Sequence, residues 1–252
     1  TSPTALPGMF TDEAAGLEWL GEPGALPVPG VVGVCDSDDA PLLLALEWIE
    51  RGALSSDGEE LLGRGLAKIH AAGAPEFGAT PVRGGGYANA PMRFNAFSLP
   101  NHPKPTWAEF YAENRLLPMA RKAVETGAYG AAEHDTIEAL AAKLPELAGS
   151  AEPPARTHGD IWSGNILADT NGVPHLIDPV AHGGHREVDL ALLTVFGGPG
   201  PRCFAAYDEV APIAPGFEER RPLWQLAMIL LHVLLFGGSY VAQSQQIARR
   251  YL

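Results

Sequence analysis

The sequence predicts an α+β fold in two parts, a small N-terminal part with strands and a larger, mostly helical part. Three observations predict this division. Two short apolar runs flank a polar turn within the first 50 residues, amphipathic helical patterns dominate from residue 56 onward, and one hairpin pattern interrupts them at 165–178. We place the boundary after residue 50, so that 1–50 form the small part and 51–252 form the helical part.

The small part is expected to hold one helix and one hairpin. Residues 11–20, "TDEAAGLEWL", have apolar residues at helical spacing, and Thr11 or Asp12 can cap the first turn. A loop rich in Pro and Gly follows. The apolar runs 31–34 and 41–49 are then predicted as strands, because the polar turn "DSDDA" between them is typical of a hairpin.

The helical part is marked by capping signals and apolar periodicity. Capping boxes that begin at Ser56, Thr106 and Asp135 each place a Glu three residues later, and Pro118 should kink the helix in which it lies. Residues 73–105 are rich in Gly and Pro and are predicted to form a surface loop. The predicted helices are 56–70, 107–126, 136–147, 187–195, 202–209, 221–236 and a last one from about residue 240.

Composition excludes several classes of function. The net charge of −13 argues against a nucleic-acid-binding protein, which needs clustered Lys and Arg. The apolar stretch from Leu223 to Phe236 is short for a membrane span and contains Gln225 and His232, so a buried helix is expected and no membrane partner. With only two cysteines, which lack metal-ligand spacing, we expect a reduced, cytoplasmic protein.

The hairpin pattern contains the residues with the clearest chemical meaning. "NILAD" (165–169) and "VPHLID" (173–178) read as strands, with Asn171-Gly172 at the turn between them. Asn165 begins the first strand and Asp178 ends the second. Because an antiparallel hairpin brings its open ends together, these two side chains should be neighbours.

One carboxylate and one amide oxygen form a hard, oxygen-only cation site, which suits Mg²⁺ holding phosphates better than Zn²⁺. Asp160, in the loop before the hairpin, then remains to accept a proton from a substrate hydroxyl. Asp160, Asn165 and Asp178 together predict phosphoryl transfer of the type found in kinase-like enzymes, with ATP and Mg²⁺.

The runs "HGDIWSGN" (158–165), "IDP" (177–179) and "GHREVDLAL" (184–192) resemble the fructosamine/ketosamine kinase family. Further segments, among them "LEWIERG" and "LGRGLAKIH", resemble the family in the same order, so that the likeness covers nearly the whole chain. The resemblance implies a two-lobed, protein-kinase-like fold, with 1–50 as the remainder of an incomplete N-lobe. It also implies the fold of the aminoglycoside phosphotransferases.

The resemblance implies a role for each matching residue. Asp160 would be the catalytic base, with Asn165 and Asp178 as metal ligands. The reaction implied is transfer of the ATP γ-phosphate to the 3-hydroxyl of a ketosamine, which is a sugar adduct on an amine. The phosphorylated product is unstable, so the family is understood as deglycating repair enzymes that act on small or protein-bound ketosamines.

Nucleotide binding is assigned by the same resemblance. Glu47, Trp48 and Ile49 would form the hinge that offers backbone groups to adenine. Glu13, on the first helix, would be the partner of a phosphate-holding lysine.

Five residues around the catalytic loop have a supporting or substrate-binding role in this prediction. Trp162 would contact the sugar or pack beneath the loop, and His158 would support the loop structurally. His185, Arg186 and Asp189 are expected to brace it, although Asp189 can also cap the following helix.

The match departs from the family at the phosphate-binding elements. The expected lysine and glycine-rich hairpin would lie before Thr1, and the sequence contains no Gly-x-Gly-x-x-Gly motif. Three accounts follow: a segment precedes the given sequence, the protein is a degenerate kinase, or the phosphates are held otherwise. Phosphorylation of an aminoglycoside or another amino sugar is the alternative enzymatic function. A nucleotide-binding pseudokinase that acts through partners is the alternative of a different class.

Overall fold

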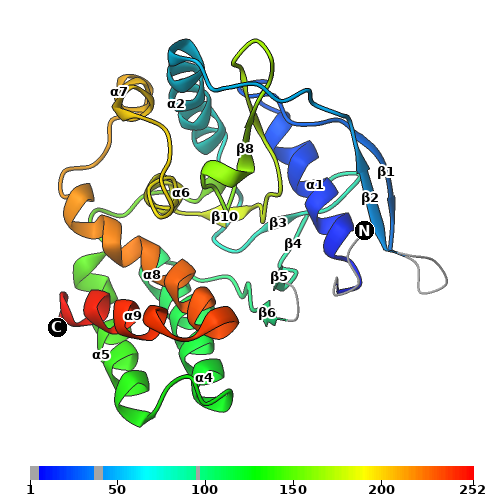
Figure 1. Ribbon diagram of the computed structural model, residues 1–252. Helices are drawn as coiled ribbons and strands as arrows, with labels where there is room; N and C mark the ends of the chain where they lie inside the picture. The colour runs from blue at the N-terminus through cyan, green and yellow to red at the C-terminus, as the bar shows by residue number, and fades with distance from the viewer. Residues whose placement is uncertain (1–5, 37–41, 95–96) are drawn as a thin grey trace.

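The structure is a computed structural model that describes residues 6–36, 42–94 and 97–252. Helix α1 (Met9–Gly21) and the antiparallel strands β1 (Val31–Cys35) and β2 (Leu43–Leu46) lie at one side of the molecule. The C-terminal helices lie at the opposite side (Figure 1). The predicted hairpin is confirmed, although the centre of its turn falls outside the described residues. Its second strand, predicted to reach residue 49, ends at Leu46, and 47–49 form no strand.

Helix α1 begins two residues earlier than predicted, because Gly8 is its N-cap and lies in the left-handed region at φ 83°. Thr11 and Asp12 therefore do not cap it. The backbone N–H of Thr11 donates to Asp36 at the end of β1, at 2.7 Å, and Asp12 pairs with Arg93. These contacts join the first turn of α1 to β1 on one side and to a segment of the large part on the other.

The predicted helices of the large part are all present, with changed ends. They are α2 (Ser56–Ala71), α3 (Trp107–Tyr111), α4 (Leu117–Glu125), α5 (Ala131–Leu147), α6 (Arg186–Leu192), α7 (Pro201–Val210), α8 (Phe217–Phe236) and α9 (Ser239–Arg249).

Two of the three predicted capping boxes are wrong. Ser55 caps α2 and accepts from the backbone N–H of Gly58 at 2.9 Å, so the predicted cap at Ser56 is one residue too late. Helix α5 begins before Asp135, and the carboxylate of Glu133 accepts from the backbone N–H of Gly130 at its start. The box at Thr106 is confirmed, since the backbone N–H of Glu109 donates to its hydroxyl at 3.2 Å.

A π-helical turn, Ala112–Leu116, separates α3 from α4, where Pro118 occupies the first turn. The side chains of Asn114 and Arg115 both reach the chain at 100–102. Asn114 bonds the backbone N–H of His102 at 2.9 Å, and the buried Arg115 donates to the Pro100 carbonyl at 2.8 Å. Turns of this kind are frequent at functional sites.

The segment 73–105, which was predicted to form a surface loop, also contains short strands. Four short strands pair there as two small ladders, β3 (Thr80–Pro81) with β4 (Tyr87–Ala88) and β5 (Met92–Phe94) with β6 (Phe97–Leu99). Sequence patterns missed them because each strand is too short to show an alternation of apolar and polar residues.

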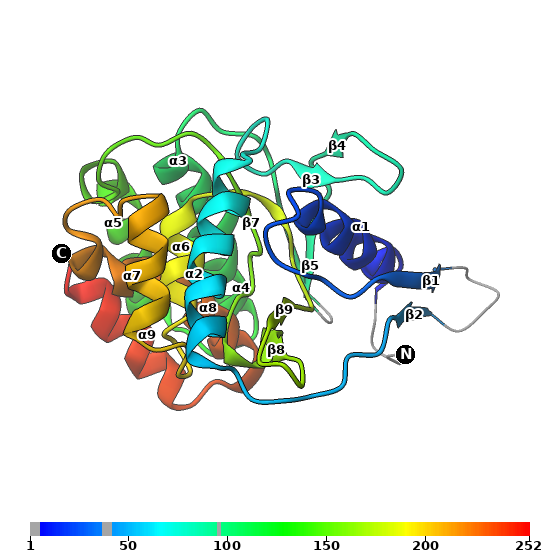
Figure 2. The same ribbon diagram turned by 90° about the horizontal axis from the view of Figure 1, so that it is seen from above.

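The predicted hairpin near the C-terminal half of the chain is confirmed as β8 (Ile166–Ala168) and β9 (Pro174–Leu176). A second ladder joins β7 (Ala155–Thr157) to β10 (His182–Gly184) and was not predicted. Both ladders lie between α1 and the helical mass, as Figures 1 and 2 show. The loop from β7 to β8 therefore faces the small part.

The helical core is built on aromatic side chains. Trp107 packs 5.2 Å from Phe110 and 5.6 Å from Tyr111 between ring centroids, and Trp224 of α8 closes this cluster at 5.3 Å from Tyr111. Helix α8 is thus largely buried, as predicted from its apolar stretch. No described helix has the length and apolar character that crossing a bilayer requires.

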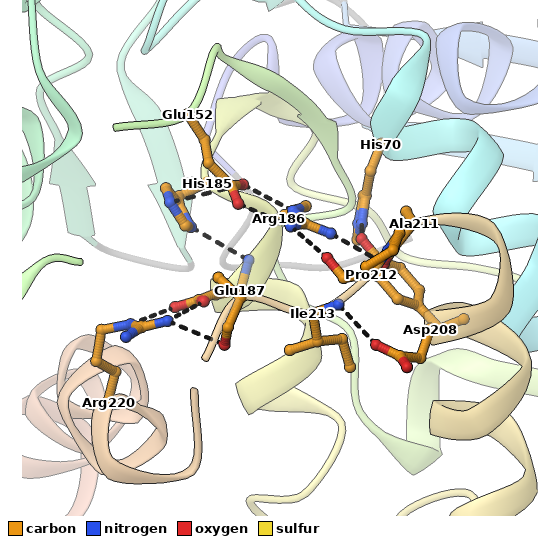
Figure 3. Close-up of polar contacts among 12 residues, drawn as sticks. His70, Glu152, His185, Arg186, Glu187, Asp208, Ala211, Pro212, Ile213 and Arg220 are labelled. Atoms are coloured by element: carbon orange, nitrogen blue, oxygen red, sulfur yellow. Dashed lines mark hydrogen bonds and ion pairs between the residues drawn. The ribbon is translucent and has the colours of Figure 1, made fainter. Parts of the chain in front are cut away.

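A buried ion pair joins α6 to α8. Glu187 is 1% exposed and accepts from Arg220 at 2.9 Å and from the indole N–H of Trp224 at 2.8 Å. Figure 3 shows the pair beside His185. The neighbouring Arg221 forms only an exposed pair with Glu218 on the same helix.

We predict that Arg220→Met lowers the free energy of unfolding by about 3 kcal/mol, because it leaves a buried carboxylate without its cation. Arg221→Met, one residue away, is the matched control and should cost less than about 1 kcal/mol. Urea unfolding followed by circular dichroism measures both. Equal losses in the two variants would contradict the buried pair as a source of stability.

A buried histidine gives a pH dependence. His182 is 6% exposed, and burial, with a smaller contribution from the nearby Arg115 charge, lowers its pKa to about 4. In the unfolded chain this histidine has a pKa near 6.5, so between about pH 6.5 and pH 4 it is protonated there and neutral in the folded protein. Stability should fall as the pH decreases from about 6.5 to about 4, by roughly 3 kcal/mol in total.

The measurement is the free energy of unfolding between pH 4 and pH 7 for the wild type and for His182→Gln. The difference between the two curves isolates this histidine from the others, and it should shrink as the pH falls. Parallel curves would show that His182 titrates normally in the folded protein.

Candidate active site

The loop between β7 and β8 positions Asp160. It turns at Gly159, whose φ is +82°, and a Cβ there would lie 2.3 Å from the carbonyl oxygen of Val180, so only glycine fits. The amide nitrogen of Asn165 donates to the Asp160 carbonyl at 2.8 Å and to its carboxylate at 3.1 Å. The short helical turn Ser163–Asn165 thus fixes the carboxylate of Asp160 within the loop.

The structure brings Asn165 and Asp178 to the open end of the β8–β9 hairpin, where the sequence placed them. The backbone N–H of Ile177 donates to the Asn165 carbonyl at 3.1 Å and closes that end. Asp178 follows with φ 52°, and among the described residues it is the only non-glycine with positive φ. Such strain at a polar residue is typical of functional sites.

Glu13 reaches the same place from α1. A cleft of about 450 Å³ is lined by Glu13, Asp160 and Asp178, and by residues of α1, of 80–101 and of 179–182. Nothing in the sequence pattern had assigned 80–101 to this wall. The arrangement joins the small part and the large part around three carboxyl groups.

Burial, together with neighbouring carboxylates, raises the pKa values of Glu13 and Asp160. Burial, and then the neighbouring Asp178 carboxylate, raise the pKa of Glu13 to about 8. Burial raises the pKa of Asp160 to about 6, against the hydrogen bond from Asn165, which lowers it. Among the described lining residues the basic side chain of Lys or Arg type is Arg93, which pairs with Asp12, so the carboxyl groups of Glu13, Asp160 and Asp178 outnumber the cations and the cleft favours a bound cation.

The donor set fits a magnesium ion. The amide nitrogen of Asn165 is already used by Asp160, which leaves the amide oxygen as the group that can bind a cation. The carboxylate of Asp178 supplies a second oxygen. Oxygen ligands of this kind suit Mg²⁺ and do not suit Zn²⁺.

Asp189 holds the loop between β7 and β8 through the backbone of that loop. Its fully buried carboxylate accepts from the N–H of His158 at 2.7 Å and from the N–H of Gly159 at 3.0 Å. The side chain of His158 contacts the Ile177 carbonyl at 3.0 Å, which ties the loop to the end of the hairpin. Asp189 does not cap α6, because His185 is the N-cap.

The expected direct contact of His185 and Arg186 with the loop is not found among the described residues. His185 caps α6, with a weak bond from the N–H of Glu187 at 3.3 Å, and stacks on Trp224. Arg186 forms two bonds to Glu152 at 2.7 Å, as Figure 3 shows. The printed partners of the two side chains lie in Glu152, in 211–212, in α6 itself and in α8, so we infer that the two residues act at the start of α6.

Trp162 lies outside the described cleft. Its ring packs edge-on against Phe196 at 5.9 Å, and Phe196 in turn contacts His232 of α8 at 4.9 Å. It is half-buried. A row of aromatic side chains therefore runs from the catalytic loop to the C-terminal helices.

The segment 47–49 links the two parts. The backbone N–H of Glu47 donates to Gly30 at 2.8 Å, Trp48 is 83% exposed, and Ile49 is half-buried. Immediately afterwards the N–H of Gly52 donates to Ala168 in β8 at 2.8 Å. The segment that links the two parts therefore ends on the β8–β9 hairpin, which positions Asn165 and Asp178. Residues 47–49 themselves do not line the described cleft.

Comparisons with known proteins agree with this geometry. The fructosamine kinase family model matches residues 1–252. A protein of Synechocystis named as a probable ketoamine kinase is 34% identical over 97% of this chain and 79% of its own length. A chloroplastic protein-ribulosamine 3-kinase of Oryza sativa subsp. japonica is 32% identical over 98% of this chain and 69% of its own.

Solved structures show the same fold. A candidate fructosamine-3-kinase from Thermobifida fusca has a TM-score of 0.87 at 43% identity and covers 99% of this chain and 82% of its own. An aminoglycoside phosphotransferase in ternary complex with ADP and hygromycin B has a TM-score of 0.57 at 15% identity, with 98% and 84% covered. The fold is therefore protein-kinase-like, and the chain belongs to the fructosamine kinase family.

Proposed function

We propose that this protein is an ATP-dependent kinase that phosphorylates the 3-hydroxyl of a ketosamine. The observation that carries the proposal is that Asp160 and Asp178 line one cleft, while Asn165 bonds the Asp160 carboxylate and lies with Asp178 at the open end of one hairpin. Family membership supports it, and so do the names of relatives, which specify ketoamine and ribulosamine kinases.

Asp160 is the proposed catalytic base. Its raised pKa, about 6, makes it a better proton acceptor than an ordinary aspartate while it remains ionised at neutral pH. Asn165 holds this carboxylate so that it can orient the attacking hydroxyl. Asn165 and Asp178 are the proposed ligands of Mg²⁺, which when bound neutralises charge on the ATP phosphates.

Nucleotide binding is proposed for the small part and the segment that links the two parts. Glu47, Trp48 and Ile49 offer the backbone groups that meet adenine, because they lie between β2 and the hairpin. Glu13 is the proposed partner of a cation in the phosphate site, since its half-buried carboxylate faces Asp178. The two proposed lobes are residues 1–50 and residues 51–252.

The acceptor is proposed to be a ketosamine, free or protein-bound, because a substituted amine is positively charged at neutral pH and the site has an excess of carboxylates. For Trp162, which lies two residues after Asp160 in the same loop, contact with the sugar stays one proposed role, and its packing against Phe196 outside the cleft supports the other, a support beneath the loop. We also propose that the protein is cytoplasmic and repairs glycated amines by deglycation. Its two cysteines are free, which is consistent with a reducing compartment.

An acceptor screen tests the function. ADP release should be fast with fructosyl-lysine or ribulosyl-lysine and slow with kanamycin, and the product should carry phosphate on the 3-oxygen by ³¹P NMR. Preference for kanamycin would support the alternative function of an aminoglycoside kinase. That alternative is considered because the fold is similar to that of the hygromycin-bound enzyme. ATP binding without turnover of any acceptor would support the pseudokinase.

We predict that Asp160→Asn lowers kcat by at least about 100-fold, because the amide does not accept the hydroxyl proton. Nucleotide affinity, measured by calorimetry with Mg²⁺ and a non-hydrolysable ATP analogue, should remain within a few-fold of the wild type. Asp169→Asn is the control, since this exposed-turn carboxylate caps the far end of the hairpin. A normal rate in Asp160→Asn would disprove the proposed base.

A further inference from the structure

The carboxylate of Asp189 has a third partner besides the two loop amides. Nε2 of His70, on α2, lies 3.2 Å from its Oδ2 atom. His70 is 4% exposed and Asp189 is 0% exposed, so water does not compete for this contact. Hydrogen bonds and nearby charge lower the pKa of Asp189 despite its burial, which keeps it as an acceptor.

The other nitrogen of His70 is also bonded. Nδ1 lies 2.8 Å from the hydroxyl of Tyr207 on α7, and Tyr207 is fully buried. Because an ionised carboxylate can only accept, Nε2 carries the hydrogen in the neutral ring and Nδ1 accepts from the tyrosine hydroxyl. The donors thus run in one direction, from Tyr207 through His70 to Asp189.

Close packing fixes the two helices that supply this chain. A Cβ on Gly63 of α2 would lie 2.0 Å from the carbonyl oxygen of Cys203 on α7, so the backbones touch at this point. The Arg186 guanidinium lies beside the Tyr207 hydroxyl and is held by Glu152. Figure 3 shows Arg186 bonded to Glu152 and to the carbonyl of Ala211, with the His70 side chain close by.

We propose that His70 is a positioning residue for catalysis, and that Tyr207 fixes its orientation. The proposal rests on the kinase function proposed above. His70 holds the Asp189 carboxylate so that its two oxygens meet the N–H groups of His158 and Gly159. These amides set the path of the chain immediately before Asp160, and a displacement there of a fraction of an ångström is costly for transfer.

The experiment compares His70→Leu with His70→Gln. Leu removes both bonds, whereas the amide of Gln can place an N–H donor near the position of Nε2. We expect His70→Leu to lower kcat by 10-fold to 100-fold, with KM for ATP unchanged within about two-fold, and His70→Gln to restore most of the rate. His134→Leu, on the distant helix α5, is the matched control and should keep the wild-type rate.

Hydrogen exchange gives a readout that does not depend on the acceptor. The amides of His158 and Gly159 should exchange faster in His70→Leu than in the wild type, while those of the α8 core remain protected. If His70→Leu does not fold, Tyr207→Phe is the second variant, and the same two amides should exchange faster in it.

Unchanged exchange of these amides in a folded His70→Leu, or in Tyr207→Phe if the first variant does not fold, would overturn the proposal. A lower rate that His70→Gln fails to restore would also overturn it, because the loss would then reflect packing. If the wild type phosphorylates no acceptor, the proposed function fails, and the exchange comparison still decides whether His70 holds the two loop amides through Asp189.

Discussion

The bond between the buried carboxylate of Asp189 and the backbone of the catalytic loop is the constraint on which the site depends. Both oxygens of Asp189 are occupied by the N–H groups of residues 158 and 159, at 2.7 and 3.0 Å. A side chain that bonds backbone fixes position without consuming the side chains of the loop. Asp160 and Asn165 are therefore left free for each other and for ligands, and the hairpin end closes over them through Ile177.

The same region concentrates negative charge that the protein does not neutralise by itself. Glu13, Asp160 and Asp178 come from three separate segments and share one cleft, and the first two have raised pKa values for that reason among others. Folding brings these groups together against their mutual repulsion, which is typical of a site that a cation and its ligand complete. The positive φ of Asp178 is part of the same cost.

Much of this arrangement could be predicted from sequence because it depends on local patterns. The Asn171-Gly172 turn identified the hairpin, and hairpin geometry then placed Asn165 beside Asp178. Contacts between distant segments could not be predicted in this way. The wall at 80–101 is built from very short strands, and the place of His185 and Arg186 depends on how α6 meets the chain near Glu152 and α8. The apolar periodicity around His70 predicts that this face of the helix is buried, but it does not predict the contact with Asp189.

The π-helical turn Ala112–Leu116 also has a bearing on how the cleft wall could change over evolution. A regular α-helix rotates by about 100° per residue, so the extra residue in this turn lets the helix keep its core face on both sides. Asn114 and Arg115 can then face the loop at 100–102, which follows β6. If one residue of the π-helical turn were deleted, Tyr111 and Met119 would still face the core on either side of it. The bonds from the turn to the cleft wall at 100–102 would be lost. Insertions and deletions, more than substitutions, are thus the changes by which this face of the cleft could be reshaped.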